Sequence, residues 1–325
     1  MYVLELGGDD DAFAAAEAGA AAENVRVVAP GLALADTLDE ERFAGLAYVH
    51  RAGGYVADVA ATVGDSVAAL ETVDFDRNGS VAVRARDVRK TVGLDTQQAE
   101  RELGSVLVDH GFTVDLDNPD YELRATFSGD SCYLSWLAAE SVRDYGDRKP
   151  TDRPFFQPGS MDPLLARAVC NLARVEPGDR VLDPMCGTGG VLIEAGLLGA
   201  RPLGTDAQAK MVRGARQNLA HFREAFAADG FDVARADGTR LPLRDDTIDA
   251  VVFDAPYGRQ SKIETHDLAD LVGGALAEAR RVGDRCVLVA DRDWRDEATE
   301  AGWTVETRFE RRVHRSLTRY VLVLA

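Results

Sequence analysis

The chain has 325 residues, 46% of them hydrophobic, and a formal net charge of −18. This length predicts two or three domains, and the apolar content excludes general disorder. No stretch approaches membrane-spanning length, and no basic stretch precedes an apolar one near the first residue. We therefore expect a soluble, cytoplasmic protein with no membrane partner.

Arginine takes the place of lysine almost throughout the chain. There are 4 lysines against 33 arginines, alongside many carboxylates and alanines, a composition that resembles proteins of salt-loving archaea. In molar salt the Debye length falls to about 3 Å, so the acidic surface would not exclude a polyanionic partner. At low salt the same charge would argue against nucleic acid.

The first half of the sequence predicts strands interrupted by helices. An alanine-rich helix is expected over 10–23, and a second helix over 95–111 stops at Gly111. Strands are expected at 2–6, 24–30, 79–88 and 121–136, the last broken by a turn at 128–131.

A stretch rich in proline, glycine and charge separates the two halves, and we take 146–162 as a linker. Asp162 can then cap a helix that begins at Pro163. Beyond it strands and helices alternate, which predicts a parallel sheet covered by helices on both faces. The strands are expected at 180–183, 201–206, 232–237, 249–254 and 286–291, with a closing hairpin over 303–325.

Four of these strands are expected to end in aspartate, at Asp183, Asp206, Asp237 and Asp254. The carboxyl ends of parallel strands line the ligand crevice of an open sheet. Any one of these residues could simply cap a helix, but four in series indicate a ligand site.

A glycine loop, "DPMCGTGG", follows the first of these strands over 183–190. Gly187 and Gly189 let the backbone approach a ligand, whereas Leu192 stands where a dinucleotide fingerprint has its third glycine. Asp206 lies 17 residues after Gly189, close to the spacing of a ribose-binding acid. Asp237 is placed to accept from an adenine amino group. The pattern favours S-adenosylmethionine as cofactor over a pyrophosphate-bearing ligand.

The loop and the corner "DAPYG" (254–258) together resemble class I methyltransferases that act on exocyclic amino nitrogens. The hallmark of that group is Asn/Asp-Pro-Pro-Tyr/Phe, and Ala255 stands where it has its first proline. The segments 153–173 and 311–320 are similar to archaeal THUMP-domain enzymes that methylate N2 of guanine 10 in tRNA.

This resemblance implies an α/β Rossmann-like methyltransferase domain, with a mostly parallel seven-stranded sheet, preceded by an α+β RNA-binding half. The implied division is a ferredoxin-like piece over 1–55, a THUMP domain over 56–145, the linker over 146–162 and the methyltransferase domain over 163–325. The implied cofactor-binding residues are Asp183, Cys186, Gly187, Thr188, Gly189, Asp206, Asp237 and Asp254.

In the family reading Asp254 accepts an N–H bond from the guanine amine and takes its proton. The carbonyl of Ala255 or Pro256 is the second acceptor, Pro256 fixes the turn, and Tyr257 stacks on the base. The resemblance also implies that the amine is methylated twice.

Two groups of basic residues stand out in this acidic chain. Arginine suits phosphate contacts, but a strand could equally pair its outward arginines with surface carboxylates. Both readings stay open for the first group, and RNA is favoured for the second. The candidate RNA-binding residues are Arg84, Arg86, Arg89 and Lys90 in the first group and Arg311, Arg312 and Arg315 in the second.

Other functions stay open beside tRNA guanine-10 methylation. They are N2-guanine methylation elsewhere in tRNA or rRNA, N6-adenine methylation, glutamine N5 methylation, and an inactive RNA-binding protein, for which Ala255 is the suspicious feature. The four scattered cysteines form no CxxC pair, so we expect neither disulfides nor a metal requirement. A monomer is slightly favoured.

Overall fold

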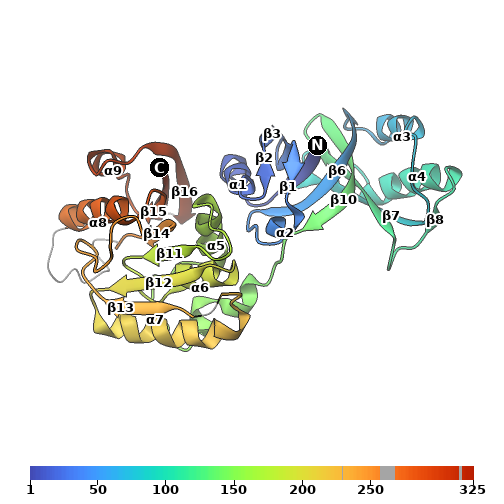
Figure 1. The fold of residues 1–325 in the computed structure, drawn as a ribbon. Helices are drawn as coiled ribbons and strands as arrows, with labels where there is room; N and C mark the ends of the chain where they lie inside the picture. The colour runs from blue at the N-terminus through green and yellow to red at the C-terminus, as the bar shows by residue number, and fades with distance from the viewer. Residues whose placement is uncertain (229, 257–267, 315–316) are drawn as a thin grey trace. The chain divides into compact units, whose positions relative to one another are not determined.

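The computed structural model describes residues 1–228, 230–256, 268–314 and 317–325. The chain divides into an N-terminal unit, Met1–Val142, and a C-terminal unit, Arg143–Ala325 (Figure 1). Each unit has its own sheet and its own buried core. Within the described ranges, no helix combines the length and the apolar character needed to cross a membrane.

The N-terminal unit is built on an eight-stranded sheet in the order β3-β4-β1-β6-β10-β9-β7-β8. The strand β6 runs through the expected division at 55/56 and pairs with β1 on one side and β10 on the other. The elements are β1 Tyr2–Leu6, α1 Asp11–Ala18, β2 Ala22–Glu23, β3 Arg26–Ala29, β4 Leu32–Ala35, β5 Thr37–Leu38, α2 Glu40–Phe43, β6 Val49–Ala60, α3 Val63–Glu71, β7 Ser80–Asp87, α4 Thr96–Asp109, β8 Thr113–Val114, β9 Tyr121–Ser128 and β10 Ser131–Glu140.

The helix expected over 10–23 is shorter than its alanine content predicts. Asp10 caps α1 by accepting from the Phe13 N–H, and the helix ends at Ala18 before Gly19. Residues 22 and 23 instead pair with β5. The other predictions for this unit agree better: α4 follows an Asp95 cap, and β9 and β10 form a hairpin across Gly129, whose φ is +58°.

The C-terminal unit carries a seven-stranded sheet in the order β13-β12-β11-β14-β15-β17-β16. The first five strands are parallel, and β17 runs antiparallel to both β15 and β16. This confirms the mostly parallel sheet and the closing hairpin. The elements are α5 Pro163–Leu172, β11 Arg180–Asp183, α6 Gly190–Leu197, β12 Arg201–Asp206, α7 Ala209–Phe222, β13 Asp232–Arg235, β14 Ala250–Asp254, α8 Leu268–Val282, β15 Cys286–Ala290, α9 Arg295–Glu300, β16 Val305–His314 and β17 Leu317–Leu324.

Apolar strands in the middle of this sheet hold the cofactor edge in place. Val251 and Phe253 of β14 are fully buried in a cluster that α8 and α9 help to form, and Val212 of α7 belongs to a second cluster with α6. Burial of such side chains contributes about 1.5–3 kcal/mol each. The strand ends are therefore rigidly placed.

Candidate active site

Three strands of the parallel sheet end in carboxylates at one edge. Asp183 ends β11, Asp206 ends β12 and Asp254 ends β14. The prediction for Asp237 is wrong in one respect: β13 stops at Arg235, so Asp237 lies in the following turn rather than at a strand end. β12 ends at Asp206, opposite Arg235, so the chain beyond Arg235 has no further partner on that strand, and a bridge from Asp237 to Arg240 closes the turn.

The turn after β13 still lies against the glycine loop. Asp237 accepts hydrogen bonds from the Thr239 N–H at 2.9 Å and the Thr239 hydroxyl at 2.8 Å. A Cβ built on Gly238 would stand 3.4 Å from the carbonyl oxygen of Pro184. The structure therefore brings Asp237 to the same edge as the strand-end aspartates.

Asp206 fixes the glycine loop to the sheet. Its carboxylate accepts from the Gly187 N–H at 3.1 Å and from the Gln208 N–H at 2.8 Å. Gly187 and Gly189 have φ values of +51° and +81°, a region that disfavours any side chain. The loop is thus held with its backbone close to the carboxylate edge.

Cys186 supports the glycine loop through the packing of its side chain, and Thr188 through a hydrogen bond of its hydroxyl. Cys186 is 4% exposed, and burial raises the pKa of its thiol well above the ordinary range. Its Sγ lies 3.1 Å from where Gly204 would carry a Cβ, so the side chain packs beneath β12. The hydroxyl of Thr188 lies 3.0 Å from that of Ser160.

Asn218 on α7 is a residue that sequence reasoning missed. Its fully buried amide accepts from the Phe155 N–H and donates to the Phe155 carbonyl, both at 2.8 Å, and also donates to the Thr188 carbonyl at 2.9 Å. One side chain therefore ties the segment before α5 to the glycine loop. The sequence carried one signal of this contact, a glycine inside the helix: a Cβ on Gly214 of α7 would overlap the Phe155 ring.

Ala255 retains a backbone bond that a proline would lose. Its N–H donates to the Val289 carbonyl at 2.8 Å, and its methyl group packs in the core with Phe253 and Trp294. Proline has no N–H to give. Ala255 thus continues the pairing of β14 with β15 one residue beyond Asp254, while Tyr257 lies outside the described residues.

Asp183 is a buried carboxyl at this edge with a strongly perturbed pKa. It is 3% exposed and accepts from the Met185 N–H at 3.0 Å. Burial raises the pKa of Asp183 well above its ordinary value, and the charges of Asp254 and Asp206 raise it further. The edge is therefore suited to a ligand that brings positive charge or hydroxyl donors.

The first basic group is largely paired within the N-terminal unit. Arg84 donates to the Leu116 carbonyl, Arg86 binds the buried Glu5, and Arg89 binds Asp11. The exposed Lys90 follows them. In the second group Arg311 is half-buried and Arg312 exposed on β16, and Arg315 lies outside the described residues. RNA contacts at both groups stay predictions.

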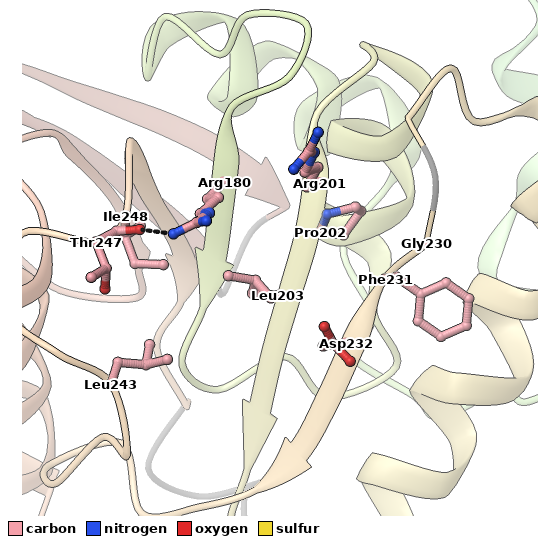
Figure 2. A pocket seen from close by; sticks show the side chains of 10 residues that line it. All are labelled: Arg180, Arg201, Pro202, Leu203, Gly230, Phe231, Asp232, Leu243, Thr247 and Ile248. Atoms are coloured by element: carbon pink, nitrogen blue, oxygen red, sulfur yellow. Dashed lines mark hydrogen bonds between the residues drawn. The ribbon is translucent and has the colours of Figure 1, made fainter.

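A pocket of about 550 Å³ lies at the opposite edge of the sheet. It is lined by residues at the amino ends of β11, β12 and β13, among them Arg180, Arg201 and Asp232 (Figure 2). Arg180 donates to the Thr247 carbonyl there at 3.5 Å. Asp183 and Asp206 lie at the carboxyl ends of β11 and β12, the edge at which ligands of open α/β sheets bind. Within the described ranges, no group of three His, Cys, Asp or Glu side chains is placed to hold a metal.

The raised pKa of Asp183 predicts that the stability of the wild type, compared with that of Asp183→Asn, falls as pH rises. A carboxyl with a raised folded-state pKa stabilises the fold most below its unfolded pKa of about 3.9, and that stability is lost as pH rises through the folded pKa. Asparagine keeps the acceptor for Met185 without this loss. In urea unfolding experiments, raising the pH from 4 to 7 should therefore lower the unfolding free energy of the wild type relative to that of the variant. A wild type that gains on the variant as pH rises would contradict the buried-carboxyl account.

Each half of the chain matches the model of a known protein family. Residues 64–137 match the THUMP domain model, and residues 150–321 match the model described as RMKL-like, methyltransferase domain. A tRNA (guanine(10)-N2)-dimethyltransferase of Methanothermobacter thermautotrophicus is 36% identical over 291 residues, covering 86% of this chain and 83% of the relative.

Two solved structures share the fold along nearly the whole chain. TrmN from Thermus thermophilus aligns with a TM-score of 0.51 at 21% identity, over 99% of this chain and 98% of its own. The methyltransferase SMU.472, complexed with SAH, aligns with a TM-score of 0.51 at 13% identity, over 99% and 97%. The chain therefore belongs to the THUMP-containing family of S-adenosylmethionine-dependent methyltransferases that includes the archaeal tRNA (guanine(10)-N2)-dimethyltransferases.

Proposed function

We propose that this enzyme methylates the exocyclic N2 of guanine 10 in tRNA, and does so twice. The observation that carries the proposal is the occurrence, in one chain, of a THUMP domain and a carboxylate edge ending in Asp254-Ala-Pro. The 36% identity to an archaeal dimethyltransferase of that name supports the choice of nucleotide. A tRNA substrate would place the enzyme in the cytoplasm.

The residues of the edge fit S-adenosylmethionine. Glycines with positive φ keep the loop free of side chains, and the carboxylates of Asp206 and Asp237 suit ribose hydroxyls and an adenine amine. Burial raises the pKa of Asp183, and a positive charge bound nearby would stabilise its carboxylate form. When bound, the cofactor supplies an electrophilic methyl group on a sulfonium.

Asp254 is proposed to prepare the guanine amine. The lone pair of N2 is delocalised into the ring, so an acceptor for its N–H bonds is needed to turn that lone pair out of conjugation. The half-buried Asp254 carboxylate would accept one N–H and then hold the proton. One N–H remains after the first methylation, which permits a second round.

The backbone beyond Asp254 supplies the second acceptor. Because the Ala255 N–H is bonded to Val289, this peptide is fixed to the sheet before any base arrives. The carbonyl of Ala255 or Pro256 would take the other N–H, and Tyr257 is proposed to stack on the base. Fixed geometry of this kind can contribute about 7–11 kcal/mol to lowering a barrier.

The direct test maps the methylated nucleotide. The enzyme is incubated with an unmodified tRNA transcript and labelled S-adenosylmethionine at molar salt, and the product is digested. We expect N2,N2-dimethylguanosine at position 10. A matched transcript with inosine at position 10 lacks only the exocyclic amine and should take no label there. Label at another nucleotide, or on protein, would refute the assignment.

Substitution of Asp254 tests its role apart from cofactor binding. Asp254→Ala should lower the transfer rate by about 10²–10⁴-fold, the range of general acid–base catalysis. Asp254→Asn keeps an acceptor and should retain more activity. Both variants should bind S-adenosylhomocysteine nearly as tightly as the wild type. Turnover by Asp254→Ala within tenfold of the wild type is the result that the proposed role does not allow.

A further inference from the structure

The strand beside the catalytic corner is also followed by an aspartate. β15 ends at Ala290, and Asp291 comes directly after it. β14 and β15 are parallel neighbours in which Asp254 stands opposite Val289. Asp291 therefore lies on the adjoining strand, two residues beyond the level of Asp254, at the edge where the sheet presents its carboxylates.

The alternation of the two strands assigns Asp254 and Asp291 to one face of the sheet. Phe253 of β14 and both Leu288 and Ala290 of β15 belong to the buried cluster that α8 and α9 help to form. Successive side chains of a strand point to opposite faces. Asp254 follows Phe253 and Asp291 follows Ala290, so both belong to the face opposite to that cluster.

The carboxylate of Asp291 is not used by the local structure. Asp291 is half-buried, and no hydrogen bond or ion pair engages its side chain within the part of the chain that the structure describes. Asp293 differs, because it accepts from the Arg295 N–H at 3.2 Å and from Arg308 Nε at 2.8 Å. A partly buried acceptor without a donor is suited to an N–H group of a ligand.

The next strand of the sheet presents an arginine at the same level. β17 is antiparallel to β15, and their register beyond Ala290 sets Arg319 opposite Asp291. Leu322 belongs to the cluster with α8 and α9, so the alternation assigns Arg319 to the face of the two aspartates. The side chains along this edge therefore follow the order acceptor, acceptor, donor across β14, β15 and β17.

The target base carries the complementary order. Along one edge of guanine lie the exocyclic amine, the N1–H and the O6 carbonyl, which are two donors followed by an acceptor. In 2,6-diaminopurine the 2-amine is the same, but N1 is an acceptor and position 6 carries a second amine. A carboxylate is only an acceptor, so beside the amine it bonds guanine and repels the N1 lone pair of diaminopurine.

We propose that Asp291 accepts the N1–H of the target guanine while Asp254 accepts from its amine, with Arg319 on the O6 side. Asp291 would then determine the specificity of the enzyme for guanine. The inference rests on the proposed function and names the group that reads the base. It applies to whichever guanine of the tRNA is methylated.

Methylation of two transcripts that differ at one base tests the proposal. One carries guanine and the other 2,6-diaminopurine at the nucleotide that the wild type methylates. The wild type should prefer guanine by at least about 100-fold in kcat/KM, since a site built to bond an N–H rejects the analogue that lacks it. Asp291→Asn, whose amide can donate to N1, should narrow that preference at least tenfold and raise the rate on diaminopurine.

Two controls separate base reading from other roles. Asp296→Asn removes an exposed carboxylate from the first turn of α9 and should keep the preference of the wild type. Asp291→Ala should lower kcat/KM on guanine without any gain on diaminopurine. Both Asp291 variants should bind S-adenosylhomocysteine as tightly as the wild type.

Three results would overturn the proposal. They are a wild type that methylates both transcripts equally, an unchanged preference in Asp291→Asn, and an equal loss on both transcripts, which would mean that Asp291 only supports the corner. Methylation of a guanine other than guanine 10 would refute the proposed function alone, because the comparison is made at the nucleotide that is methylated.

Discussion

Parallel pairing of β11, β12 and β14 is the constraint on which the site depends. Because parallel strands all present their carboxyl ends at one edge, Asp183, Asp206 and Asp254 are forced together despite their distance in sequence. Burial raises the pKa of Asp183, and the charges of Asp254 and Asp206 raise it further. The sheet therefore gathers negative charge at this edge, which favours a ligand with hydroxyl and cationic groups.

The loop that faces these carboxylates is positioned by two polar side chains rather than by packing alone. Asp206 holds the loop at Gly187, and Asn218 holds it at Thr188. Asn218 also binds the backbone of Phe155, so the segment before α5 and the glycine loop are fixed as one body. Beneath them, the fully buried Glu194 of α6 pairs with Arg148 and Arg167, and Arg148 also pairs with Asp144.

Much of this architecture follows from local sequence. The apolar strands, the helix start at Gly190 and the Asp162 cap are encoded by residues adjacent in the chain. The prediction was wrong where tertiary pairing competes with propensity: residues 22 and 23 leave an alanine-rich helix for a strand, and β13 ends before Asp237. Glu194 and Asn218 could not be found because the partners they bond lie at least 27 residues away in sequence. The hydrogen bond from Ala255 to β15 could not be predicted either, because it depends on the register of the sheet.

The central claim is that the carboxyl edge of the sheet, rather than the pocket at its amino edge, is the cofactor site. Amide hydrogen exchange with and without S-adenosylhomocysteine tests this claim most directly. The account predicts slower exchange on binding in 183–190, 204–208 and 236–240, with residues 230–232 and 247–249 of the amino edge unchanged. Protection confined to the amino edge would contradict it.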